Sequence, residues 1–89
     1  MKNVVLVGYG KMGSSIAQGW KLKSLKFNFF VIEKESSLRS IAVRDGLQSY
    51  ESVDELLKFV DKEALDIIFL AVKPQQMSET IKVFSIAKL

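Results

Sequence analysis

The sequence predicts an α/β fold, in which an open parallel sheet carries helices on both faces, and three observations lead to this prediction. Strand-like apolar runs alternate with segments of helical period along the 89 residues. The strongest runs, at positions 4–7, 27–32 and 65–72, are uninterrupted, which is typical of strands buried on both faces. Strands and helices that alternate at this length require right-handed β-α-β crossovers, so we expect the strand order 3-2-1-4.

The first strand, Val4 to Val7, leads into the glycine-rich stretch GYGKMG and then into the first helix. Apolar residues in this helix recur every four positions, at Met12, Ile16 and Trp20. Gly13 and Ala17 form a row of small residues in the same segment. Such a row allows the helix to lie close to the sheet.

The second β-α unit begins with the strand Phe27 to Ile32. The helix that follows is marked by apolar positions at Leu38, Ile41 and Ala42. Asp45 and Gly46 are residues that commonly end a helix. The weaker apolar run after them, Leu47 to Tyr50, predicts a short edge strand.

The third helix begins at a capping-box sequence, in which Ser52 and Glu55 can each satisfy a backbone amide. Apolar residues at helical spacing follow, at Val53, Leu56, Leu57 and Val60. The fourth strand spans residues 65–72, and Pro74 opens a fourth helix, because proline fits the first helical turn. That helix carries three apolar residues on one face, Met77, Ile81 and Phe84. We therefore expect a single domain, residues 1–89, truncated after the fourth β-α unit.

Composition excludes several function classes. The 48% hydrophobic and 26% charged residues are the balance of a globular domain, and 89 residues are too few for a two-domain enzyme. The absence of cysteine and histidine removes disulfides, thiolate and Ser-His-Asp nucleophiles and nearly every transition-metal site, so no metal is expected. No run reaches the roughly 18 apolar residues that span a bilayer, and no signal peptide is evident. We therefore expect a cytoplasmic protein without a membrane partner.

Charge is unevenly distributed along the chain. Residues 1–44 contain eight Lys/Arg against Glu33 and Glu35, whereas residues 45–89 contain five against eight Asp/Glu. The basic half holds the glycine-rich stretch and suits a phosphate-bearing ligand, although solvated lysines on helix surfaces are the commoner reason for such a bias. A nucleic-acid partner is not expected, because the lysines are scattered and no basic stripe with interleaved aromatics occurs.

The stretch Gly8 to Gly13 has the pattern G-x-G-x-x-G, directly after a strand and at the start of a helix. In that place Gly8 makes the tight turn, Gly10 admits a pyrophosphate and Gly13 allows close packing of helix and strand. The unpaired amides and the positive end of the helix face the pyrophosphate. The pattern predicts a dinucleotide site of the Rossmann type, and the alternative is a purely structural turn. A Walker-type loop is disfavoured, because its Gly-Lys-Ser/Thr is missing.

The acidic residue expected in such a unit is Glu33, twenty positions beyond Gly13 at the end of the second strand. Its carboxylate can accept hydrogen bonds from the adenosine ribose, which favours NAD, since a carboxylate repels a 2′-phosphate. Other polar residues of the same turn can hold that phosphate instead, namely Lys34, Ser36, Ser37 and Arg39. Exposure to solvent and capping of the second helix account equally well for these residues, so NAD and NADP both stay open.

Two stretches, VVLVGYGKMGSSIAQGW and DIIFLAVKPQQM, resemble signatures of one family, the N-terminal domain of pyrroline-5-carboxylate reductase. They have the order and separation of that family, and the resemblance covers essentially the whole chain. The Ala-Val-Lys-Pro-Gln run is much more specific than the glycine pattern, because related dehydrogenases of hydroxy acids and phosphogluconate share the glycine turn but usually lack this run.

The resemblance implies a reductase that passes hydride from NAD(P)H to the C=N carbon of pyrroline-5-carboxylate, a cyclic imine, and yields proline. It tips the cofactor slightly toward NADP. The family's pyrophosphate loop matches Gly8, Tyr9, Gly10, Lys11, Met12 and Gly13. Its loop beside the nicotinamide-side ribose matches Ala71, Val72, Lys73 and Pro74. No catalytic acid or base can be named from these residues.

The chain also departs from the family. Glu51 and Ser52 stand where the family often has an asparagine near the cofactor, and the segment Asp61 to Leu65 is longer. The family's further strands and its C-terminal domain for substrate binding and dimerisation are absent. We therefore expect a homo-oligomer for the full-length protein, no turnover by the isolated chain, and self-association of the chain along the exposed edge of residues 65–72. The rival functions are a hydroxy-acid or phosphogluconate-type dehydrogenase domain and a non-enzymatic nucleotide-binding module.

Overall fold

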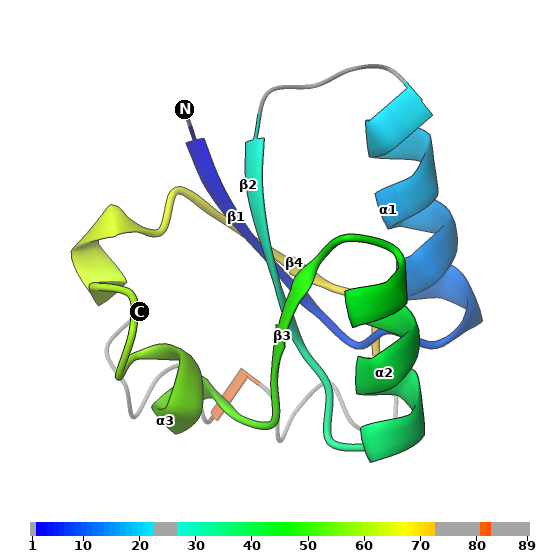
Figure 1. Cartoon of the computed structure of the whole chain (residues 1–89). Coiled ribbons are helices and arrows are strands. Elements are labelled where there is room, and N and C mark those ends of the chain that lie inside the picture. Colours follow the sequence, from blue (N-terminus) through cyan, green and yellow to red (C-terminus); the bar gives the residue numbers. More distant parts are fainter. Residues whose placement is uncertain (1, 23–26, 73–80, 83–89) are drawn as a thin grey trace.

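The computed structural model describes residues 2–22, 27–72 and 81–82 and contains one parallel sheet (Figure 1). Its strands are β1 (Lys2–Val7), β2 (Phe27–Ile32), β3 (Gln48–Tyr50) and β4 (Ile67–Leu70). They are ordered β3-β2-β1-β4, and each neighbouring pair is parallel. The predicted order 3-2-1-4 is confirmed, with β1 in the interior of the sheet.

Helices cover both faces of the sheet (Figure 1). The helices α1 (Lys11–Leu22) and α2 (Ser36–Arg44) lie on one face, and the short helix α3 (Val53–Leu56) lies on the other. A 3₁₀ turn, η1 (Lys62–Ala64), precedes β4. The arrangement is a Rossmann-like fold, as predicted.

The core consists of two apolar layers that meet at β1. Val5 and Val7 face α3, in a cluster with Val53 and Leu56, whereas Leu6 faces α1 and α2. Val5 is 0% exposed and Leu6 is 1% exposed, so the strand is buried on both sides. This double burial is the physical reason for its uninterrupted apolar run.

The ends of α2 follow the sequence prediction closely. Asp45 is the C-cap residue, and Gly46 has a φ of +87°. The Leu47 amide donates to the Ala42 carbonyl and the Gly46 amide to the Val43 carbonyl, which together form a Schellman motif. The positive φ explains why glycine follows the helix.

The third helix is shorter than predicted. Its start is confirmed, because the Ser52 hydroxyl accepts from the Glu55 amide at 3.2 Å, but the α-helix ends at Leu56. Beyond it, the amides of Lys58 and Phe59 donate to carbonyls three residues back, as in a 3₁₀ turn. This tighter turn still packs the predicted apolar residues Leu57 and Val60 against the α3-side cluster, so the apolar spacing did not require a longer helix.

The predicted fourth helix falls almost entirely outside the described residues. Of its predicted apolar face only Ile81 is described, in a helical pair with Lys82. Across residues 2–22, 27–72 and 81–82, no helix has the length and apolar character needed to cross a membrane.

Candidate functional site

The candidate site lies where the carboxyl ends of β1, β2 and β4 come together. Val7 is opposite Ile32 on one side and Leu70 on the other. Backbone hydrogen bonds continue one residue further, from the Gly8 amide to the Ile32 carbonyl and from the Ala71 amide to the Val7 carbonyl, each 2.8 Å. The first residues after these strands are therefore held side by side at the edge where open α/β sheets bind ligands.

Two glycines of the turn are required by close packing. Gly8 has a φ of +97°, and a Cβ there would lie 2.6 Å from the Ala71 carbonyl oxygen. A Cβ on Gly13 would collide with the Gly8 carbonyl group, so α1 starts directly against the end of β1. The tight turn at Gly8 and the close packing of helix and strand at Gly13 agree with the prediction, and the contact of Gly8 with the residue that follows β4 adds to it.

Gly10 differs from these two glycines. A Cβ at this position would meet no atom within 4 Å, so the protein itself imposes no steric need for glycine. Gly10 directly precedes the 12-residue helix α1, whose first turn carries no acidic residue. The open space therefore lies at the positive end of a helix with unpaired amides, which is a place that accepts a pyrophosphate.

Lys11 and Met12 lie at the start of α1 and are both exposed. Met12 is 60% exposed, although the four-residue apolar spacing groups it with Ile16 and Trp20. The α1 residues buried against the sheet are instead Gly13 and Ala17. Lys11 and Met12 thus present their side chains to solvent beside the open space at Gly10.

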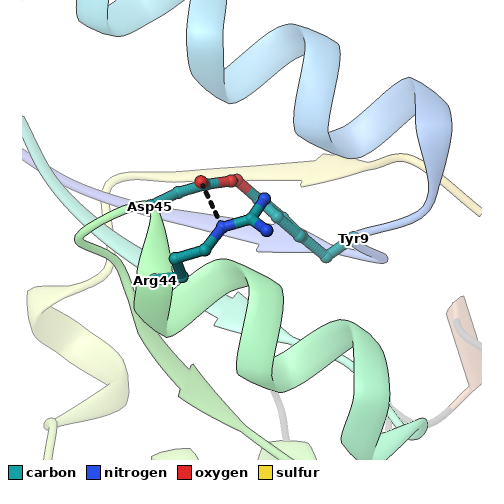
Figure 2. Close-up of polar contacts among 3 residues, drawn as sticks. All are labelled: Tyr9, Arg44 and Asp45. Carbon is teal, nitrogen blue, oxygen red and sulfur yellow. Dashed lines mark hydrogen bonds and ion pairs between the residues drawn. The ribbon is translucent and has the colours of Figure 1, made fainter.

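Tyr9 is fastened to the protein at both its backbone and its side chain. Its amide donates to Glu33 Oε1 at 2.8 Å, and its hydroxyl donates to Asp45 Oδ2 at 2.6 Å. The side chain is 1% exposed and reaches from the turn toward the end of α2 (Figure 2). Burial first, and the hydrogen bond to Asp45 second, raise the pKa of the Tyr9 hydroxyl far above its usual value near 10. The neutral phenol is therefore a stable donor.

Glu33 directs its carboxylate at the backbone of the turns. One oxygen accepts from Tyr9 and the other accepts from the Glu35 amide at 3.0 Å. The residue is half-buried at the end of β2 and links this strand to the glycine turn. A carboxylate oxygen can accept more than one hydrogen bond, so Glu33 keeps the capacity to bind a ribose hydroxyl.

The β2–α2 turn is stabilised by Arg39. Its Nη1 donates to the carbonyls of Glu33 at 2.9 Å and Lys34 at 2.7 Å. The predicted phosphate-binding residues Lys34, Ser36 and Ser37 are exposed in the same turn. These cationic and hydroxyl groups therefore lie next to Glu33, as the sequence spacing implied.

The β4 side of the site is only partly described. Ala71 is buried and belongs to the same cluster as Leu6 and Tyr9, and Val72 is half-buried beside Gly8. Lys73 and Pro74, the other two predicted residues of this loop, lie outside the described residues.

Sequence reasoning missed the role of Asp45, which was predicted only as a helix stop. No local pattern relates it to Tyr9, 36 positions away in the chain. Within the described ranges, no group of three or more acidic side chains is placed to hold a metal ion.

Comparison with known proteins agrees with this geometry. The family model described as "NADP oxidoreductase coenzyme F420-dependent" matches residues 3–88. A solved structure described as an NAD-binding protein from Listeria innocua is similar, with a TM-score of 0.60 and 27% identity, over 94% of this chain and 24% of that one. The chain therefore spans about a quarter of the length of this neighbour. A comparison with curated proteins gave no match.

Proposed function

The chain belongs to the family described as NADP oxidoreductase, coenzyme F420-dependent, and from that premise we propose that it is the NAD(P)H-binding part of a pyrroline-5-carboxylate reductase. The reaction adds hydride to the C=N carbon of the cyclic imine and a proton to its nitrogen, and it yields proline. The family's domain is one that pyrroline-5-carboxylate reductases share. The stretch Leu70 to Met77, with its Ala-Val-Lys-Pro-Gln run, is the feature that supports this substrate over hydroxy acids.

The observation that carries cofactor binding is the contrast within the glycine turn. Gly8 and Gly13 are required by contacts of the protein with itself, whereas Gly10 faces open space at the start of α1. A turn that served only the fold would not need glycine at Gly10. The residues fit a dinucleotide, because the amides at the start of α1 can hold its pyrophosphate and Glu33 lies at the ribose end.

Bound NAD(P)H supplies the hydride, and the chain supplies position. The start of α1 would hold the pyrophosphate, and Ala71 and Val72 would border the nicotinamide half, because they follow β4, the neighbour of β1 on that side. For the whole protein we also propose that it contacts the imine substrate, holds a proton donor, forms a dimer and is cytoplasmic. We also propose that these 89 residues bind cofactor without turnover on their own, because most substrate contacts of the resembling family come from its C-terminal domain.

NADP carries a 2′-phosphate on its adenosine ribose and NAD does not, and of these two cofactors we favour NADP slightly. Glu33 is engaged with two backbone amides, so its carboxylate is turned toward the protein. Lys34, Ser36 and Arg39 then offer positive charge and hydroxyl groups to a 2′-phosphate. Glu33 itself supports NAD, because its charge stays close to the ribose.

A fluorescence titration of the chain with NADPH and NADH tests the proposal. We expect saturable binding of at least one cofactor, and we expect Gly10→Val to weaken it by at least about tenfold, because the added side chain fills the pyrophosphate space. Gly19→Val is the matched control, since Gly19 lies further along α1 and a Cβ there also meets no atom within 4 Å. Equal binding by Gly10→Val and the wild type would contradict the proposed site.

The same titration on Lys34→Ala separates the two cofactors. Under the NADP proposal this variant loses affinity for NADPH and keeps its affinity for NADH. Equal losses for both would assign Lys34 no role at the 2′-phosphate. A steady-state assay of the full-length protein with pyrroline-5-carboxylate, hydroxy acids and phosphogluconate then distinguishes the reductase from the rival dehydrogenases, and absence of turnover with all of them would favour a non-enzymatic module.

A further inference from the structure

We propose that Tyr9 and Asp45 form an anchor that holds the glycine turn in one conformation and thereby raises cofactor affinity without contacting the cofactor. Tyr9 is thus a positioning residue, and Asp45 is its support. The effect on affinity rests on the proposed function above, whereas the ordering of the turn does not.

The need for an anchor follows from the residues beside Tyr9. Gly8 and Gly10 flank it, and glycine leaves the backbone more conformational freedom than any other residue. Ala71 confines Gly8, whereas a Cβ on Gly10 would meet no atom within 4 Å, so the turn would otherwise vary in shape at Gly10. Fixing the residue between them restricts the dihedral angles available to both neighbours.

The contacts of Tyr9 hold it from two separate elements. The backbone amide is bound by Glu33 at the end of β2, and the hydroxyl is bound by Asp45 at the end of α2. Both acceptors are carboxylates, which form stronger hydrogen bonds than neutral oxygens. Between these two contacts the ring is enclosed in the apolar cluster of Leu6, Ala17, Val31, Ala42, Leu47 and Ala71.

Asp45, which accepts the hydrogen bond of the Tyr9 hydroxyl, is itself held by further contacts. Asp45 is the C-cap residue of α2, its amide donates to the Ile41 carbonyl, and its Oδ1 lies 3.6 Å from Arg44 Nε (Figure 2). The Asp45 side chain is 14% exposed, so it is largely screened from water. The end of α2 therefore offers a largely buried and hydrogen-bonded acceptor to the turn that follows β1.

Anchoring of this kind changes the cofactor affinity because it orders the turn in the protein before the cofactor binds. A turn that is already ordered loses less conformational entropy when a ligand binds than a turn that must become ordered. Because the Tyr9 amide is engaged with Glu33, the amides available to a pyrophosphate are those from Gly10 onward, and their direction depends on how Tyr9 is held.

The test compares Tyr9→Phe and Asp45→Ala with the wild type by amide hydrogen exchange and by NADPH titration. We expect exchange to accelerate about tenfold at two amides of the turn, that of residue 9, which donates to Glu33, and that of Ser14, which donates to the Gly10 carbonyl. The amide of Val31 in β2 should keep its exchange rate. A uniform acceleration would indicate general destabilisation and would overturn the proposal.

We expect the NADPH Kd to rise about threefold to tenfold in both variants, and no further in the double variant, because the two residues act through one hydrogen bond. Asp45→Asn keeps an acceptor and should recover most of the affinity. Tyr50→Phe is the matched control, since the Tyr50 hydroxyl contacts only the exposed Gln48 side chain among the described residues.

The outcomes separate the two proposals. Absence of NADPH and NADH binding by the wild type would overturn the proposed function, while the exchange rates would still decide whether the anchor orders the turn. Accelerated exchange with an unchanged Kd would overturn the effect on affinity. If Tyr9→Phe does not fold, Asp45→Ala makes the same test from the acceptor side, and unchanged exchange in that variant would overturn the anchor.

Discussion

The glycine turn is held in different ways on its two sides. Toward β2, polar contacts define its shape, because Glu33 binds the Tyr9 amide and Arg39 binds the carbonyls that follow the strand. Toward β4, close packing defines it, because Gly8 and Ala71 approach too closely for any side chain on Gly8. The adenosine side of the proposed site is thus built by hydrogen bonds, and the nicotinamide side is built by steric fit.

The two sides also differ in how far the protein covers them. β2 lies inside the sheet, between β1 and β3, and its last residues Phe30, Val31 and Ile32 are buried. β4 is at the edge of the described sheet, and its side chains Ile67 and Phe69 are about two-fifths exposed, at 40% and 41%. A sheet edge with apolar side chains is prone to pair with other chains. Substitutions around the turn should therefore differ in effect. They range from a large loss of stability at the packed Gly13 to a small change in the pH dependence of stability at Tyr9.

The largest effect is expected from filling the steric contact between the start of α1 and the glycine turn. Gly13→Ala should lower the free energy of unfolding by about 2–4 kcal/mol, because the new Cβ collides with the Gly8 carbonyl group. The clash must exceed the gain of about 1 kcal/mol that alanine normally brings to a helix. Urea unfolding measures the change.

The matched control for this variant is Gly10→Ala, because Gly10 has no atom within 4 Å of its would-be Cβ. Its stability should stay within about 0.5 kcal/mol of the wild type. Equal stability of the two variants would mean that the turn relaxes freely, and the distinction between a packed and an open glycine would be lost.

An intermediate effect is expected on self-association through the β4 edge, which we propose for the chain on its own. Ile67→Lys should shift the sedimentation equilibrium toward monomer at high concentration, because a lysine on a strand edge opposes pairing with another strand. Val43→Lys is the control, since Val43 is 60% exposed on α2, away from this edge. A wild-type chain that is strictly monomeric at millimolar concentration would contradict the proposal.

The smallest effect is expected at alkaline pH on the β2 side. The raised pKa of Tyr9 means that the folded state keeps the phenolic proton where the unfolded chain loses it. This contribution to stability is complete below pH about 10 and is lost as the pH rises above it, by at most about 1.4 kcal/mol per pH unit. Other groups titrate in the same range, so the measurement is the difference between wild type and Tyr9→Phe.

In denaturation curves from about pH 9 to 11, on either side of the usual tyrosine pKa, the wild type should therefore lose stability more steeply than Tyr9→Phe. Parallel pH dependences for the two proteins would indicate that the Tyr9 phenol ionises as readily in the folded state as in the unfolded chain. The polar contact to Asp45 would then contribute little to the difference between the two sides of the turn.

The sequence by itself determined the class of fold and predicted the place of the candidate site. Alternating apolar runs and helical periods sufficed for the strand order β3-β2-β1-β4, because strands buried on both faces must be uninterrupted. The glycine pattern after the first strand located the tight turn of the proposed cofactor site, and the Asp45-Gly46 pair located the end of α2, because a positive φ admits few residues other than glycine. These features depend on neighbours in the chain, which a sequence displays directly.

Only the tertiary structure decided which glycine the packing requires and which one faces open space, since that depends on whether Ala71 or empty space lies beside it. It likewise decided that the Tyr9 side chain is anchored rather than exposed, and that Met12, with a similar apolar character, faces solvent. It also decided that α3 ends at Leu56 and that the 3₁₀ turn after it packs Leu57 and Val60 against the cluster of Val53 and Leu56. Contacts between residues far apart in the chain leave no periodic pattern, so they emerge only when the elements are packed together.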